Sequence, residues 1–223
     1  MQRPSGVLLD VDGTLLDSND AHAHSWVKAL AEAGISVEYA DVRRKIGKGG
    51  DKLLPEVAGI EGDSAKGQAV SKRRGEIFRK EYLPTLRAFP GVKKLLSRMK
   101  QDGLELAVAS SSKKDELGAL LRVCGVDEFI KASTSSDDAE NSKPDPDIVH
   151  SALGRLGHPP ERVILLGDTP YDVEASLKAG IRVVAVRCGG WGDPDLRGAI
   201  RIYDDPADLL AHYRDSPFAS EDS

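Results

Sequence analysis

The residues best suited to chemistry are acids that directly follow short apolar segments. Val7–Leu9 runs into Asp10 and Asp12, and Val163–Leu166 runs through a glycine into Asp168. Side chains alternate along a strand, so Asp10 and Asp12 are expected on the same side where the first strand ends. Acids gathered at one point repel each other unless a cation neutralises them, and oxygen donors without histidine or cysteine suit a hard ion. This pattern predicts a Mg²⁺ site.

The residues beside these acids also have types that matter. Gly13 lets the backbone bend sharply and approach a ligand closely, and Thr14 adds a hydroxyl and an amide. Thr169, Pro170 and Asp172 fit a helix capping box, with the threonine as N-cap and the proline at the first helical position. The capping box is a sufficient structural reason for Asp172, whereas Asp168 has none.

A third apolar segment, Leu104–Ala109, ends in three serines. Ser112 forms an SxxD pattern with Asp115, which predicts a helix cap and not a ligand. Ser110 lies at the strand end itself, where hydroxyl and helix-start amides form an anion site of phosphate size. The rigid loop that contains Lys143 supplies one cation, and a loop lysine alone is usually only solvated.

These segments must be brought together by a fold, and their pattern indicates which one. Fully apolar strands alternating with helices are typical of a parallel sheet covered on both faces. The predicted strands are 7–9, 104–109, 163–166 and 182–186. The carboxyl edge of such a sheet is where α/β proteins bind ligands. We therefore predict an α/β fold with a doubly wound parallel sheet.

A stretch without strand-like runs interrupts this pattern between residues 17 and 87. It reads as amphipathic helices over 18–33, 41–46, 51–58 and 64–82, with the loop Gly47-Lys48-Gly49-Gly50 between the second and third. The prediction is an α-helical cap domain at 17–87, inserted into a core formed by 1–16 and 88–223. The final residues, 216–223, are expected to be a loose tail.

Four motifs, in this order, resemble the haloacid dehalogenase superfamily in its phosphatase branch. They are DxDGT at Asp10–Thr14, a strand-end serine at Ser110, KPxP at Lys143–Pro146 and GDTxxD at Gly167–Asp172. The resemblance spans the core, and the helical insert is placed like the family's type-1 cap. Phosphoglycolate phosphatases and β-phosphoglucomutase-like enzymes are the members that it resembles.

The resemblance implies a role for each matching residue. Asp10 would be the nucleophile that forms a phosphoaspartate, and Asp12 the general acid and then the general base. Mg²⁺ would be held by Asp10, the main-chain carbonyl of Asp12 and Asp168, with Asp172 ligating the ion directly or orienting a water on it. The residues expected at the phosphoryl group are Ser110, Ser111, Lys143, Gly13 and Thr14.

Other activities remain open at this stage. A sugar phosphomutase is the main alternative, because His22 is placed like the mutase histidine that contacts the general acid, although a local hydrogen bond explains it equally well. Such mutases carry an arginine in the cap loop where this chain has Gly50, and Lys48 or the arginines at 73 and 74, which could substitute, are expected to be mostly solvated. The glycine-flanked Lys48 also suggests a mobile loop that closes over the active site and contacts the leaving group, with a plain turn between helices as the alternative. A non-catalytic receiver module would need neither Asp12 nor a cap.

Composition excludes several classes of partner and site. The net charge is -5 with scattered basic residues, so no nucleic-acid partner is expected. The two cysteines form no CxxC pair, which predicts neither a disulfide framework nor a zinc site and fits a reducing cytoplasm. No apolar run approaches the roughly 20 residues that cross a bilayer, and no leader is recognised. The expected partner is a small phosphorylated metabolite, with phosphoglycolate, sugar phosphates and nucleotides all possible and the oligomeric state open.

Overall fold

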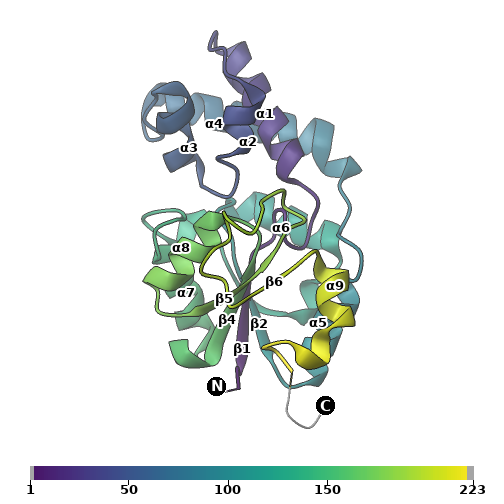
Figure 1. Cartoon of the computed structure of the whole chain (residues 1–223). Coiled ribbons are helices and arrows are strands. Elements are labelled where there is room, and N and C mark those ends of the chain that lie inside the picture. Colours follow the sequence, from purple (N-terminus) through teal and green to yellow (C-terminus); the bar gives the residue numbers. More distant parts are fainter. Residues whose placement is uncertain (1–2, 220–223) are drawn as a thin grey trace.

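The computed structural model describes residues 3–219, which form a twisted parallel sheet with helices on both faces and further helices above one edge (Figure 1). The strands are β1 (Gly6–Leu9), β2 (Glu105–Ala109), β3 (Ile130–Thr134), β4 (Val163–Gly167), β5 (Arg182–Val186) and β6 (Arg201–Tyr203). Their order is β3-β2-β1-β4-β5-β6, and every neighbouring pair is parallel. The predicted doubly wound α/β sheet is therefore confirmed.

Both faces of the sheet are buried, which explains why its central strands are apolar throughout. Val7 and Leu9 of β1 point into one apolar cluster, and Leu8 points into the cluster on the opposite face. Helices α5 (Val92–Gln101), α6 (Lys114–Cys124) and α9 (Pro206–Ala211) cover the first face. Helices α7 (Asp147–Leu156) and α8 (Pro170–Lys178) cover the second. Because side chains alternate between the two faces, the position of a residue along the strand determines whether it points toward the site at the end of the strand.

Two strands, β3 and β6, were not predicted. Both lie at the edges of the sheet, where one side has no neighbouring strand. In β3 exposed and half-buried residues alternate, and β6 has only three residues. Edge strands do not need the continuous apolar run by which the central strands were recognised.

The chain between β1 and α5 forms a helical unit, defined here as helices α1 to α4. They are α1 (Asn19–Glu32), α2 (Tyr39–Arg43), α3 (Gly50–Ala58) and α4 (Ala65–Ile77). A π-helical turn, Phe78–Tyr82, extends α4, so the predicted helices are present with ends shifted by a few residues. The unit has its own apolar cluster around Trp26, Leu30 and Leu54, and Figure 1 places it above the edge of the sheet.

The end of the chain differs from the expectation. Phe218 is fully buried in the apolar cluster beside Tyr213, so the prediction of a loose tail is wrong for residues 216–219. Burial of the Phe218 ring in the core stabilises this segment. The mostly polar residues around the ring form no apolar pattern from which this burial could have been predicted. The rest of that tail, 220–223, lies outside the described residues. Among the helices described, none has both the length and the apolar character needed to cross a membrane.

Candidate active site

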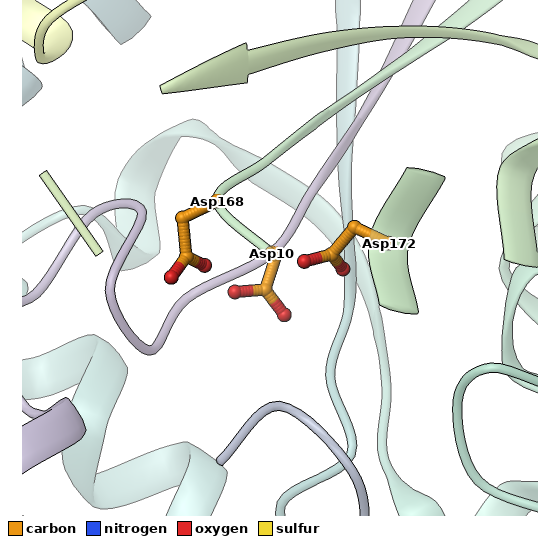
Figure 2. Close-up of side chains that lie close together, drawn as sticks. All are labelled: Asp10, Asp168 and Asp172. Carbon is orange, nitrogen blue, oxygen red and sulfur yellow. The ribbon is translucent and has the colours of Figure 1, made fainter. Parts of the chain in front are cut away.

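Three acids meet at the carboxyl edge of the sheet, where the strand order reverses on either side of β1. Asp10 directly follows β1, Asp168 directly follows β4, and Asp172 lies in the first turn of α8. One carboxylate oxygen of each lies within 4.8 Å of the others, and all three residues are buried (Figure 2). We call these residues the acidic triad. Neighbouring parallel strands bring their ends together, which is why the sequence placed Asp10 beside Asp168 correctly.

Lys143 is the cation of this cluster. Its side chain is fully buried, and Nζ lies 2.7 Å from each of Asp10 Oδ1, Asp172 Oδ1 and the Ala109 carbonyl oxygen. The loop before α7 delivers it to the edge of the sheet, as the motif suggested. A buried lysine without such partners would pay a large desolvation cost, so its three bonds are what keep it charged there. Asp10 and Asp172 outweigh the effect of burial and raise the pKa of Lys143.

The triad has more negative charge than Lys143 can neutralise. Three ionised carboxylates and one ammonium leave two negative charges, and two charges about 4 Å apart repel by ~4 kcal/mol at an effective dielectric near 20. Burial, with help from Asp172 and Asp12 and against Lys143, raises the pKa of Asp10 to about 7. Burial and the charges of Asp10 and Asp172 also raise the pKa of Asp168 well above its usual value. Oxygen donors with this excess charge fit a hard divalent cation.

Asp172 serves the helix and the site with different oxygens. Thr169 and Asp172 form the predicted capping box, in which Asp172 Oδ2 accepts from the Thr169 amide at 3.0 Å and from its hydroxyl at 2.6 Å. Its Oδ1 faces Lys143. The cap is therefore confirmed, and it orients the remaining oxygen toward the triad.

Gly13 and Thr14 form a tight turn against the triad. Gly13 has φ of +82°, and a Cβ there would stand 2.2 Å from Asp168 Oδ2. The Thr14 hydroxyl lies 2.9 Å from Asp168 Oδ1 and 3.2 Å from Asp10 Oδ2. The Gly13 amide donates to the Leu16 carbonyl and the Thr14 amide to the Val11 carbonyl. The Gly13 carbonyl also accepts from Cys188 Sγ at 3.3 Å. The binding of phosphate by Gly13 and Thr14 stays a prediction.

The Asp12 carboxylate points to a different set of partners. Oδ1 accepts from the Ser18 hydroxyl at 2.6 Å and lies 2.7 Å from His22 Nε2, while Oδ2 accepts from the Ser112 hydroxyl at 2.9 Å. Although burial opposes it, the combined effect of these three partners lowers the pKa of Asp12 to about 2. The side chain thus shares the edge with Asp10, as predicted, without joining the acidic triad.

Ser112 corrects the interpretation of the serine run. The predicted helix cap is wrong, because α6 begins at Lys114 with Lys113 as N-cap and shows no side-chain cap bond. Ser112 precedes that N-cap, and its hydroxyl binds Asp12. Ser110 is buried and accepts from the Ser112 amide at 3.1 Å. The Ser111 hydroxyl oxygen is buried with no hydrogen-bond partner among the described residues.

Part of the predicted site lines one small cavity between the core and the helical unit, and the predicted residues on its walls are Asp10, Asp12, His22, Lys48, Ser110 and Ser111. The remaining predicted residues, which are Gly13, Thr14, Lys143, Asp168 and Asp172, do not line it. The cavity has a volume of about 50 Å³. Its walls are Asp10, Asp12, His22, Trp26, Ile46–Gly50, Arg74 and Ser110–Ser112. A larger cavity of about 630 Å³ lies between residues 36–57 and the aromatic side chains of Tyr171 and Trp191. Neither Asp12 nor any residue of the acidic triad lines that larger space, so the chemistry is assigned to the smaller one.

His22 connects Asp12 to an arginine that sequence reasoning set aside. The His22 ring stacks on Phe78 at 4.2 Å, and Arg74 Nη2 lies 3.2 Å from His22 Nδ1. Arg74 Nη1 donates to both carboxylate oxygens of Glu116, at 2.6 and 2.8 Å. The expectation of a solvated side chain is wrong for Arg74, which is 14% exposed, and for Lys48, which is 11% exposed. It fits only Arg73, which is 46% exposed.

The glycine loop of the helical unit reaches the core. Lys48 is paired with Glu56 at 2.5 Å and lies over the Tyr171 ring. The Gly49 amide donates to the Ser142 hydroxyl at 3.0 Å, and that hydroxyl donates to Asp51 Oδ1 at 2.6 Å. The loop is thereby attached to the residue that precedes Lys143.

Several partners in the site had no signal in the sequence. Asn19 Nδ2 donates to Asp168 Oδ2 at 2.9 Å. Asn19 is the first residue of α1, and nothing in the local sequence indicated this contact. Ser18 is the N-cap residue of α1, and Arg74 and Glu116 lie on helices α4 and α6. Their contacts depend on how the helical unit sits on the core. Val70 and Ile77, which lie one turn before and one turn after Arg74 on α4, could have indicated a buried face, but not its partner.

The sequence matches known proteins along most of its length. Residues 7–186 match the family model described as haloacid dehalogenase-like hydrolase. The chain is 33% identical over 192 residues to the chloroplastic protein Suppressor of Quenching 1 of Arabidopsis thaliana, covering 82% of this chain and 18% of that longer protein. It is 30% identical over 211 residues to a phosphoglycolate phosphatase of Aquifex aeolicus, covering 92% and 94%. The crystal structure of a hydrolase from Pseudomonas syringae has a TM-score of 0.87 and 27% identity, covering 95% of this chain and 98% of that one.

Proposed function

The chain belongs to the haloacid dehalogenase-like hydrolase family, and from that premise we propose that it hydrolyses small phosphate monoesters through a phosphoaspartate on Asp10, with Mg²⁺ as cofactor. Several relatives are named as phosphatases, among them the phosphoglycolate phosphatase of Aquifex aeolicus, and another is named as a pyrophosphatase. The observation that carries the proposal is Asp10 itself, fixed by Lys143 inside the acidic triad and open to an enclosed cavity.

Asp10 is held as a nucleophile requires. Lys143 binds Oδ1 and the Thr14 hydroxyl lies near Oδ2, so the carboxylate has one fixed orientation. One of its oxygens attacks phosphorus, the bond from phosphorus to the leaving oxygen breaks, and the phosphoryl group is carried as an acyl phosphate. Lys143 and the Ser110–Ser111 hydroxyls are the groups proposed to hold the phosphoryl oxygens.

Asp12 is the proposed proton carrier. In the first step it gives a proton to the leaving oxygen, and in the second it takes one from the water that releases phosphate from Asp10. Ligand-free Asp12 has a pKa of about 2 and is ionised. The negative charge of a bound phosphoryl group raises that pKa, so protonation of Asp12 accompanies substrate binding. Ser18, His22 and Ser112 orient it for both transfers.

The residues proposed to hold Mg²⁺ are Asp10, Asp168, Asp172 and the main-chain carbonyl of Asp12. When bound, the ion neutralises the excess charge of the triad and stabilises charge on the phosphoryl oxygens. The buried Asn19 Oδ1, which has no partner among the described residues, lies on the side chain that orients Asp168 and is suited to a water of the metal site.

The helical unit is the proposed cap, with boundaries at 17–87 and the core at 1–16 and 88–223. Its separate apolar cluster and its contribution of Trp26, Ile46–Gly50 and Arg74 to the cavity support this division. When the cap closes over Asp10, it excludes bulk water and brings the residues that contact the leaving group to the site.

The mutase alternative needs a cation for a second phosphate. Gly50 supplies none, and Arg74, the arginine on the cavity wall, is already paired with Glu116. A receiver module is disfavoured because it would not use Asp12 or enclose its acceptor. Both observations support hydrolysis over the alternatives.

The experiment that tests the proposal is phosphate release from a panel of metabolites with Mg²⁺ and with chelator, together with a check for isomerised hexose phosphate. We expect release that depends on Mg²⁺ and is abolished in Asp10→Asn. Asp145→Asn is the matched control. Asp145 lies on the same loop as Lys143, but its ion pairs are partly exposed to solvent and involve no residue of the acidic triad. Isomerisation without release would contradict the proposal and select the mutase.

A further inference from the structure

The cavity wall opposite Asp10 contains two cations, and the protein neutralises both of them. Arg74 is paired with Glu116 through two short bonds, and both side chains are almost fully buried. Lys48 is paired with Glu56 at 2.5 Å. Within residues 3–219, neither cation of this wall is left to meet a charge on a ligand.

The remaining groups on that wall are neutral or negative. Trp26, Ile46 and the glycines of the loop are uncharged, and the Asp12 carboxylate lies 2.7 Å from His22 Nε2. Glu116 Oε1 is 4.0 Å from His22 Nδ1, so the His22 ring contacts Asp12 through one nitrogen and lies near Glu116 with the other. A carboxylate or second phosphate on the leaving group would therefore bring a negative charge to a wall whose two cations are already paired with acids, and no free cation described at this wall would offset it.

Two polar atoms in this region have unused hydrogen-bonding capacity. The Ser111 hydroxyl and Arg74 Nε are buried, and neither has a partner among the described residues. Buried polar atoms are normally satisfied, so both are suited to a ligand: the Ser111 hydroxyl to the phosphoryl group, as proposed above, and Arg74 Nε to a hydroxyl of the leaving group. The volume of about 50 Å³ also restricts size, because one water already needs ~10–15 Å³ by this kind of measure.

We propose, resting on the phosphatase function above, that the preferred leaving group is a small uncharged alcohol of a few heavy atoms and not a carboxylate or a second phosphate. The substrate class is thus the monophosphate of a small diol or triol. One of its hydroxyls accepts a hydrogen bond from Arg74 Nε, while the paired state of Arg74 and Lys48 discriminates against anionic substrates of equal size.

The first test uses the unaltered enzyme with Mg²⁺ and two pairs of substrates matched in size. The pairs are 2-hydroxyethyl phosphate with 2-phosphoglycolate, and glycerol 3-phosphate with 3-phosphoglycerate. We expect kcat/KM to be at least tenfold higher for the uncharged member of each pair. An equal or reversed ratio overturns the inference while leaving the phosphatase function intact, as does cleavage of p-nitrophenyl phosphate with neither uncharged compound accepted. No hydrolysis of any of the five compounds overturns the proposed function itself.

The second test removes the internal partner of Arg74. Glu116→Gln keeps the shape of the side chain and leaves Arg74 with an uncompensated charge, so the preference should move at least tenfold toward the anionic member of each pair. Glu32→Gln is the matched control, because it removes the partner of the adjacent, exposed Arg73 and should leave the ratio unchanged. Glu56→Gln makes the corresponding change at Lys48 and serves if the first variant does not fold, as judged by its thermal unfolding. Folded variants that retain the original ratio would overturn the inference.

Discussion

The charge of the acidic triad predicts how the stability of the metal-free protein depends on pH. The pKa of Asp10 is about 7 in the folded protein and 3.8 for the unperturbed group. Between these values the folded chain keeps a proton that the unfolded chain has lost, so the folded state is stabilised at low pH and loses that stabilisation as pH rises through 7. This pH dependence of stability is opposite in sign to that of a salt-bridged surface acid, whose pKa is lowered by folding.

The size of the effect follows from the same difference. A separation of about 3 units at ~1.4 kcal/mol each amounts to ~4 kcal/mol over the whole range, of which roughly 2.5 kcal/mol falls between pH 5 and pH 8. For a chain of 223 residues this corresponds to a decrease in Tm of roughly 5–10 °C. Asp168 acts in the same direction, and Asp12 acts only near pH 2–4, outside this window.

The assay is thermal unfolding followed by circular dichroism in chelator at pH 5 and pH 8, with and without added Mg²⁺. We expect Tm to fall from pH 5 to pH 8 in chelator and Mg²⁺ to restore it at pH 8, since binding to the folded state alone stabilises by mass action. Asp168→Asn should reduce both effects, and Asp145→Asn, at an exposed acid, should change neither. A Tm that is flat or rises between pH 5 and pH 8 in chelator would refute the electrostatic account of the triad.

Three further predictions concern individual residues. Asp12→Asn should lower kcat/KM at least tenfold more for an alkyl phosphate than for p-nitrophenyl phosphate, because a phenolate leaves without protonation; equal losses would remove the general-acid role. Gly13→Ala should weaken Mg²⁺ binding measured by calorimetry, since its Cβ would stand 2.2 Å from an oxygen of the triad, whereas Gly34→Ala, with similar φ and open space, should cost only ~1 kcal/mol of stability. Asp51→Asn should leave stability within ~1 kcal/mol but raise hydrogen exchange at the Gly49 amide by loosening its bond network with Ser142; unchanged exchange would show that the loop is not held there.

The acids of the site could be predicted because they follow strands that are buried on both faces. Asp10 and Asp168 come directly after such strands, and parallel pairing of β1 with β4 then leaves them no other arrangement. Ser112 was misread because an SxxD pattern is a local signal, and the actual start of α6 lies beyond it. Arg74 was misread for a different reason: a cation on a charged helix becomes buried only when Glu116, far along the chain, lies opposite it. Local patterns therefore predicted the core end of the site and not the wall that the helical unit builds.

The two ends of the cavity differ in how the protein balances their charge, and this difference links the proposed cofactor to the proposed substrate. At the Asp10 end, three acids and Lys143 leave two negative charges, which is the charge that one divalent cation neutralises. At the opposite end, Arg74 and Lys48 each have an acid of their own, so no charge is left over. The positive charges of Mg²⁺ and Lys143 attract the phosphoryl group to the Asp10 end. At the opposite end the described residues include no unpaired cation, so a charge on the leaving group would not strengthen its binding. Mg²⁺ dependence and a preference for uncharged leaving groups are then separate consequences, and removing the partner of Arg74 should alter the second without altering the first.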